Sequence, residues 1–72
     1  MADFTFKIEQ MITCLKEEKD GWKKECNLVS WNGNDAKYDI REWSEDHTKM
    51  TRGITLTPEE MHRLVTSMAS RV

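Results

Sequence analysis

The sequence has few cysteines and no long hydrophobic run. Two cysteines, Cys14 and Cys26, are too few for a disulfide framework. Without a hydrophobic signal segment, they predict a reducing, cytoplasmic location. We expect both to be ordinary residues of an apolar face. No run approaches the ~18 apolar residues of a membrane-spanning helix, so the sequence predicts no membrane partner.

Catalytic and metal-binding motifs are also missing. His47 and His62 have no spacing that links them to either cysteine, and there is no C-x-x-C, H-E-x-x-H, glycine-rich phosphate loop or G-x-S-x-G elbow. Adjacent acids such as Glu59 and Glu60 point apart on a regular element, which is typical of solvated charge. A metal site would need ligands converging from separate elements. The sequence therefore predicts no enzyme, no cofactor and no metal.

The length of 72 residues allows one domain, residues 1–72, with a small core. A scaffold this short usually needs a disulfide, a metal, very regular packing or a second copy of itself. Self-association is the most plausible of these. The net charge of −2 argues weakly against nucleic acid, because nucleic-acid-binding domains are usually basic. The distribution of charge is more informative than its sum.

The stretch from Trp31 to Trp43 organises the chain. Its Asn32-Gly33 pair tolerates the positive φ that both central positions of a tight hairpin turn require. Because alternate residues of a strand point to opposite faces, the two flanking strands acquire one polar-aromatic face and one apolar face. The first face carries Lys23, Glu25, Asn27, Val29, Trp31, Lys37, Asp39, Arg41 and Trp43. The second, which we expect to face the core, carries Trp22, Cys26, Leu28, Ala36, Tyr38 and Ile40.

Residues 4–16 fit two templates. Phe4, Phe6 and Ile8 alternate as in a strand, whereas the apolar residues from Ile8 onward also fit helical i, i+3, i+4, i+7 spacing. The β-branched and aromatic residues favour a strand, with a bulge near residues 9–11. Further strands are expected at residues 22–31, 36–44 and 53–56, the last after a polar loop.

The last part of the sequence predicts a helix. Thr57 is a natural N-cap, Pro58 occupies the first helical position, and Glu60 completes a T-x-x-E capping box. The helix has one apolar stripe, formed by Met61, Leu64, Val65 and Met68. The expected fold is α+β: four antiparallel strands followed by one C-terminal helix (ββββα). We expect the helix to cover the sheet face that carries Leu28, Tyr38 and Ile40.

The sequence has three tryptophans, more than so small a core can bury. Trp31 and Trp43 share a face with the basic residues Lys23, Lys37 and Arg41. Exposed aromatics interleaved with basic residues on a sheet form a stacking platform for unpaired bases, each stack being worth ~1–3 kcal/mol. A protein interface is an equal alternative, because Trp and Arg are also enriched there.

The acids of this face count against a simple phosphate-binding strip. Glu25 and Asp39 either pair with its basic residues and hold them extended, or mark a part of the face that contacts no anion. The role of Trp22, on the other face, stays open between packing at a core edge, a dimer contact and a ligand contact.

Two segments together resemble a known family. K-Y-D-I-R-E-W (37–43), followed by R-G-I-T-L-T-P-E-E (52–60), resembles the single-stranded-DNA-binding domain of the transcriptional coactivator positive cofactor four. With G-W-K-K-E-C-N-L-V-S-W-N (21–32) included, the fuller similarity is to short bacterial relatives of the YdbC type, and it covers about residues 4–70. The resemblance implies a strongly curved antiparallel sheet backed by one helix. It also implies a symmetric homodimer whose concave sheets grip single-stranded DNA.

The resemblance also implies roles for individual residues. Trp31 and Trp43 would stack on bases, and the basic residues would hold phosphates. Arg41 and Arg52 match basic positions of the two motifs, while the lysines are placed only by strand and loop: Lys23, Lys24, Lys37 and Lys49. The loop between the third and fourth strands is shorter and less basic than in the coactivator, and a regulatory tail is missing. DNA binding is therefore the part of the family's function that transfers.

The sequence thus predicts a homodimeric, largely sequence-independent single-stranded-DNA-binding protein, with RNA as the other possible ligand. It would act in the cytoplasm or at the nucleoid, in transcription regulation or DNA maintenance, with the transcription machinery as a partner. The alternative is a protein-interaction dimer whose Trp/Lys/Arg face binds an acidic protein.

Overall fold

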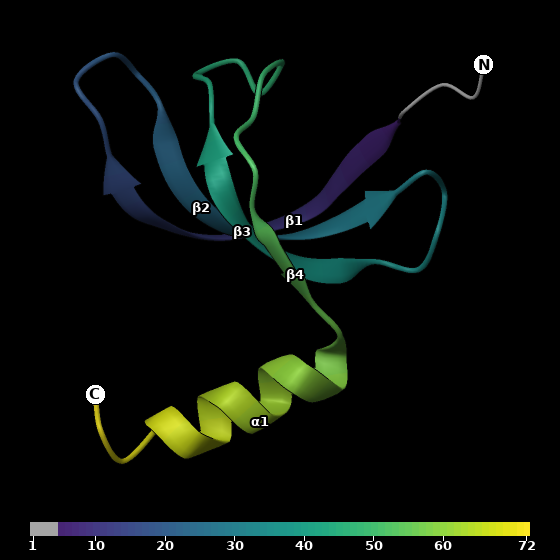
Figure 1. The fold of residues 1–72 in the computed structure, drawn as a ribbon, viewed down its shortest axis with the longest axis vertical. Coiled ribbons are helices and arrows are strands. Elements are labelled where there is room, and N and C mark those ends of the chain that lie inside the picture. The colour runs from purple at the N-terminus through teal and green to yellow at the C-terminus, as the bar shows by residue number, and fades with distance from the viewer. Residues whose placement is uncertain (1–4) are drawn as a thin grey trace.

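The computed structural model describes residues 5–72 and contains one four-stranded sheet followed by one helix (Figure 1). The elements are β1 (Phe6–Glu17), β2 (Lys23–Trp31), β3 (Lys37–Trp43), β4 (Ile54–Leu56) and α1 (Pro58–Met68). The strands lie in sequence order, and each neighbouring pair is antiparallel. The predicted ββββα order is confirmed, as is the strand at the N-terminal end. Phe4, predicted to belong to that strand, lies outside the described residues.

The hairpin between β2 and β3 turns at the predicted residues. Asn32 and Gly33 have φ values of 52° and 77°, and the Asn34 N–H donates to the Trp31 carbonyl at 2.9 Å. Positive φ at both central residues gives the turn a twist that matches the flanking strands. The resulting register pairs Leu28 with Tyr38, so the predicted division of the hairpin into two faces is confirmed.

β1 is bent by irregular pairing with β2. Its register shifts between Ile8 and Gln10, as the predicted bulge near residues 9–11 requires, and the shift recurs twice further along the strand. The 12 residues of β1 thus pair with the 9 residues of β2. Each bulge adds a residue to one strand only, which bends that strand and increases its twist.

The sheet curves so far that the two ends of one face meet. Trp31 lies opposite Phe6 at one end of β2, and Trp43 lies opposite Lys23 at the other end. Eight residue steps along a strand span roughly 26 Å at ~3.3 Å per residue. The Trp31 and Trp43 ring centroids are nevertheless only 6.5 Å apart, and the rings are stacked. The polar-aromatic face is therefore the concave face of the sheet.

The core lies on this concave face. Among the described residues, the largest fully buried side chains are Val29, Trp43, Asn27 and Asp39, and Glu25 is 2% exposed. Curvature crowds side chains on the inner side of a sheet and spreads them on the outer side. Leu28, Tyr38 and Ile40, which were expected to form the core, lie on the convex face and are only half-buried. That expectation is wrong for the single chain.

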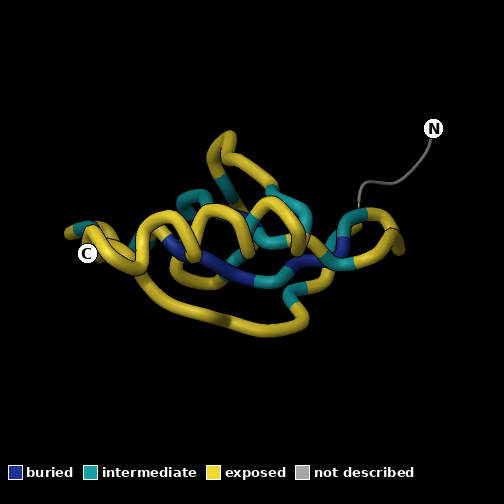
Figure 2. The backbone as a smooth tube through the Cα atoms, turned by 90° about the horizontal axis from the view of Figure 1, so that it is seen from below, coloured by how far each residue is buried: buried dark blue, intermediate teal, exposed yellow. Residues whose placement is uncertain are grey.

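The helix does not cover the sheet, contrary to expectation. α1 contacts only β3 and β4, and none of its residues is buried. It begins as predicted, with Thr57 and Glu60 forming the reciprocal bonds of a capping box. It then runs apart from the sheet, and the tube coloured by burial shows it exposed along most of its length (Figure 2). The chain passes from the short β4 through the N-cap Thr57 directly into the helix.

The two cysteines differ in environment. Cys26 is buried on the convex face, as expected, whereas Cys14 is exposed on β1, which corrects the expectation for that residue. Burial, and then the charge of Asp39, raise the pKa of the Cys26 thiol, so it stays protonated at neutral pH. Among the residues described here, no helix is long and apolar enough to cross a membrane.

Gly53 allows the chain to approach β3 closely just before β4. A Cβ atom at this position would meet the Arg41 side chain and the Ile40 carbonyl oxygen. The glycine of the R-G-I motif is therefore explained by a close approach of two backbones rather than by a turn.

Candidate functional site

Four rings from separate parts of the chain form an aromatic cluster on the concave face: Phe6, Trp31, Trp43 and His47. Trp43 lies at its centre, with ring centroids 5.1 Å from Phe6, 6.5 Å from Trp31 and 5.5 Å from His47. The ring centroid of Phe6 also lies 5.8 Å from that of Trp31. Trp43 is therefore 0% exposed, whereas Trp31 and His47 are half-buried.

Beneath the cluster, Arg41 is bound to Asp39. The guanidinium donates from Nε and Nη2 to the two carboxylate oxygens at 2.7 Å each, and its Cζ lies 4.5 Å from the Trp31 ring centroid. Asp39 is fully buried, and the Arg41 side chain is 13% exposed. Of the pairings considered from the sequence, this is the one found for Asp39. Bidentate geometry and stacking on an aromatic ring both favour arginine at this position.

Glu25 is held by two other side chains, neither of them a predicted partner. The Nδ2 group of Asn27 donates to Glu25 Oε1 at 2.9 Å. The Nε2 atom of His47 lies 2.9 Å and 3.1 Å from the two carboxylate oxygens. Because a carboxylate only accepts hydrogen bonds, Nε2 carries the proton in this pair. The buried Glu25 carboxylate thus has hydrogen-bond partners in Asn27 and His47 rather than in one of the predicted lysines.

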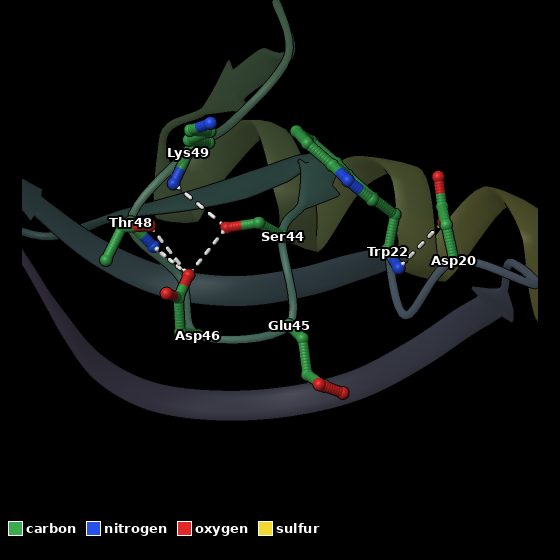
Figure 3. Close-up of a pocket in the computed structure, with 7 residues that line it drawn as sticks. All are labelled: Asp20, Trp22, Ser44, Glu45, Asp46, Thr48 and Lys49. Atoms are coloured by element: carbon green, nitrogen blue, oxygen red, sulfur yellow. Dashed lines mark hydrogen bonds between the residues drawn. The ribbon is translucent and has the colours of Figure 1, made fainter.

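The loop that carries His47 is fixed by its own hydrogen bonds (Figure 3). Asp46 accepts from the Ser44 hydroxyl at 2.9 Å and from the Thr48 hydroxyl and backbone N–H at 2.7 Å and 3.0 Å. His47 itself has a φ of 61°, and its N–H donates to the Ser44 carbonyl. The bonds from Thr48 and Ser44 lower the pKa of Asp46 to about 2. The ring position of His47 is therefore set by the loop as well as by Glu25.

A shallow cavity of about 320 Å³ lies between this loop and the turn before β2 (Figure 3). It is lined by Asp20, Trp22, Ser44, Glu45, Asp46, Thr48 and Lys49. Two of the acids are already engaged, since Asp46 holds the loop and Asp20 accepts from the Trp22 N–H at 3.1 Å. The cavity is thus built from turn-forming side chains at the edge of the sheet. Trp22 lies here and is half-buried.

The structure separates the predicted basic residues into three groups. Lys23, Lys37 and Arg41 share the concave face with Trp31 and Trp43. Lys24, next to Lys23 on the same strand, points to the opposite face. Lys49 and Arg52 are exposed in the connection between β3 and β4.

One predicted property of the site needs correction. Trp43 was expected to be an exposed aromatic, but it is fully buried because the curvature brings Phe6, Trp31 and His47 around it. For Arg41, the structure shows the pairing with Asp39 that the sequence left open, and its role toward phosphate stays a prediction. Trp31 remains the partly exposed tryptophan of the cluster.

Phe6 and His47 were not recognised from the sequence as part of the site. Strand alternation could have placed Phe6, because an antiparallel first strand brings it opposite Trp31. His47 gives no such signal, because it lies in a polar loop and meets Glu25 from 22 residues away. Within residues 5–72, no three His, Cys, Asp or Glu side chains gather where they could hold a metal ion.

Comparison with known proteins gives two consistent similarities. The family model described as Transcriptional Coactivator p15 (PC4) matches residues 18–67, which contain β2 to β4 and most of α1. An uncharacterized protein of Treponema pallidum (strain Nichols) is 42% identical over 59 residues, covering 82% of this chain and 69% of that protein.

The Asp39–Arg41 pair should be needed for folding. Replacing Asp39 by alanine leaves the Arg41 charge largely buried without its carboxylate, so we expect a loss of about 3–5 kcal/mol in unfolding free energy. Urea denaturation followed by circular dichroism measures this loss. The matched control is Glu59→Gln, which breaks an exposed pair with Arg63 at 4.0 Å and should leave the midpoint unchanged. Equal changes in unfolding free energy for the two variants would contradict the stabilising role of the Asp39–Arg41 pair.

The Asp46 bonds should make loop stability depend on pH. Because the folded-state pKa of about 2 is below the ordinary value of 3.8, ionised Asp46 stabilises the fold at pH values above about 4. This contribution disappears as the pH falls toward 2. Asp46→Ala should therefore lower the melting temperature at pH 6, and the difference from the unsubstituted protein should be much smaller at pH 2. A constant difference across this range would show that the carboxylate charge is not involved.

Proposed function

We propose, from the fact that this chain belongs to the Transcriptional Coactivator p15 (PC4) family, that it binds single-stranded DNA in a largely sequence-independent manner. The observation that carries the proposal is the half-buried Trp31 ring on the concave face, which also carries Lys23 and Lys37. An aromatic ring on the same face as basic side chains fits a base together with its phosphate. We place this activity in the cytoplasm or at the nucleoid, in transcription regulation or DNA maintenance.

In this proposal Trp31 contacts the base, and Trp43 supports Trp31 from within the cluster. Uncovering Trp43 would require His47 to leave Glu25, which is 2% exposed. A buried carboxylate that loses a hydrogen-bond partner has to be compensated by about 1–3 kcal/mol or more. One base stack returns about 1–3 kcal/mol. The closed cluster is therefore the form we expect to bind.

The phosphates would be held by side chains that have no buried partner. Lys37, Lys49 and Arg52 are exposed, and the Lys23 Nζ lies 4.0 Å from a Glu17 carboxylate oxygen, a pair that water and salt weaken. Lys24 points to the convex face, away from the proposed base platform. Arg41 contributes by fixing Trp31 through its stacked guanidinium. The role of the arginine is then orientation of the base platform.

We further propose that two copies of the chain associate through the convex face and α1. Large apolar side chains remain exposed there: Ile54, Leu64, Val65 and Met68. Within the described residues, the buried hydrophobic side chains are only Cys26, Val29 and Trp43. A chain of this size gains stability by covering such a surface with a second copy. A symmetric dimer would also present two concave faces to one strand, which raises avidity without new contacts.

Oligo-dT of about twenty nucleotides should quench the intrinsic tryptophan fluorescence. Bound phosphates release counterions, so the affinity should fall as salt rises. Trp31→Ala should weaken binding by roughly 5- to 100-fold, the worth of one stack. The comparison variant is Trp22→Ala, because Trp22 is not one of the four rings of the aromatic cluster. A duplex of equal length tests whether unpaired bases are required, and oligo-U tests RNA as the other ligand.

Absence of quenching at low salt would overturn the nucleic-acid proposal. The concave face would then be examined for an acidic protein partner, the alternative that its Trp, Lys and Arg residues allow.

Val65→Glu should convert the dimer to a monomer. Val65 is 58% exposed in the single chain, and a carboxylate placed in an apolar interface is left unpaired. Sedimentation velocity at micromolar concentration measures the change. The control is Thr66→Glu, on the polar side of the same helix. A wild-type protein that sediments as a monomer would contradict the proposed interface.

A further inference from the structure

We propose that His47 contacts nucleic acid directly and forms, beside Trp31, the accessible part of the aromatic cluster on which an unpaired base stacks. This inference rests on the proposed single-strand binding and adds a residue from the loop between β3 and β4. It assigns Glu25 as the positioning residue that holds the imidazole in place.

The first support is the order of the rings from the inside outward. Trp43 is 0% exposed, so none of its surface is available to a base. The His47 side chain is 26% exposed and lies over Trp43, with ring centroids 5.5 Å apart and an interplanar angle of 41°. A base that reaches this end of the cluster therefore meets the imidazole and not the indole.

The second support is the way in which the imidazole is fixed. Nε2 donates to a carboxylate that is itself buried and held by Asn27. The loop backbone is fixed independently by the bonds of Asp46 to Ser44 and Thr48. A ring held from both sides loses little conformational entropy when a ligand binds, which favours binding. A ring that served only to cover Trp43 would not need this double attachment.

The third support is the second ring nitrogen of His47, Nδ1. With Nε2 directed at Glu25, Nδ1 is an acceptor when the imidazole is neutral and a donor when it is protonated. The ring can thus combine stacking with one polar contact to a base edge or a phosphate. Its face is suited to a base that is not already stacked on both sides, as in a single strand.

The test uses the intact protein and its two histidines. His62 is exposed on α1 and serves as an internal control. Oligo-dT added to the protein should shift the His47 imidazole proton resonances, assigned with His47→Gln, while those of His62 stay unchanged. Nuclear Overhauser effects between His47 ring protons and thymine protons are expected. Quenched tryptophan fluorescence without these effects would overturn the role of His47 alone, whereas no quenching would overturn the proposed function.

Two substitutions provide an independent measurement. His47→Ala removes the ring and should weaken oligo-dT binding by about fivefold or more, whereas His47→Phe keeps a ring and should recover most of the affinity. The matched control is His62→Ala, with no expected change. Tighter binding by His47→Ala would show that the His47 ring blocks the site. Unchanged binding would show that the ring is not part of the binding site. Should His47→Ala fail to fold, the resonance shifts of the unsubstituted protein decide the question.

Discussion

The contact between Trp31 and Trp43 is the interaction on which the structure depends. Trp31 ends β2 and Trp43 ends β3 of the same hairpin, and their rings meet only because the sheet bends back on itself. The bend is supported by the repeated bulges in β1, which let that strand follow the outside of the curve. Between the two rings, the polar side chains of Glu25, Asn27 and Asp39 are buried.

This closure dictates how charge is distributed in the molecule. Glu25 and Asp39 are buried by it, so each needs a partner with good geometry: His47 with Asn27 for the first, Arg41 for the second. The lysine and arginine side chains with exposed charged groups remain available to the proposed ligand. A net charge of −2 is therefore compatible with a basic binding surface, because two of the acids are used internally.

The same curvature explains why a single chain leaves apolar surface exposed. Residues on the outer side of a strongly bent sheet spread apart, and α1 leaves β4 without lying across them. The apolar stripe of the helix and the convex face are then both exposed. In the proposed dimer these surfaces cover each other, which would leave the concave face of each copy open to a strand. The fold, the proposed association and the proposed binding thus all depend on one geometric property of the sheet.

The sequence by itself determined the local features. Asn32-Gly33 specifies the turn, alternation specifies the two faces, and Thr57 with Glu60 specifies where α1 begins, because each depends on the conformation of a few adjacent residues. Only the tertiary structure decided which face is buried. Alternation cannot reveal curvature, so the covered Trp43 and the Glu25–His47 pair, joined across 22 residues, could not be read from the chain. Their positions follow from long-range packing, which no local pattern encodes.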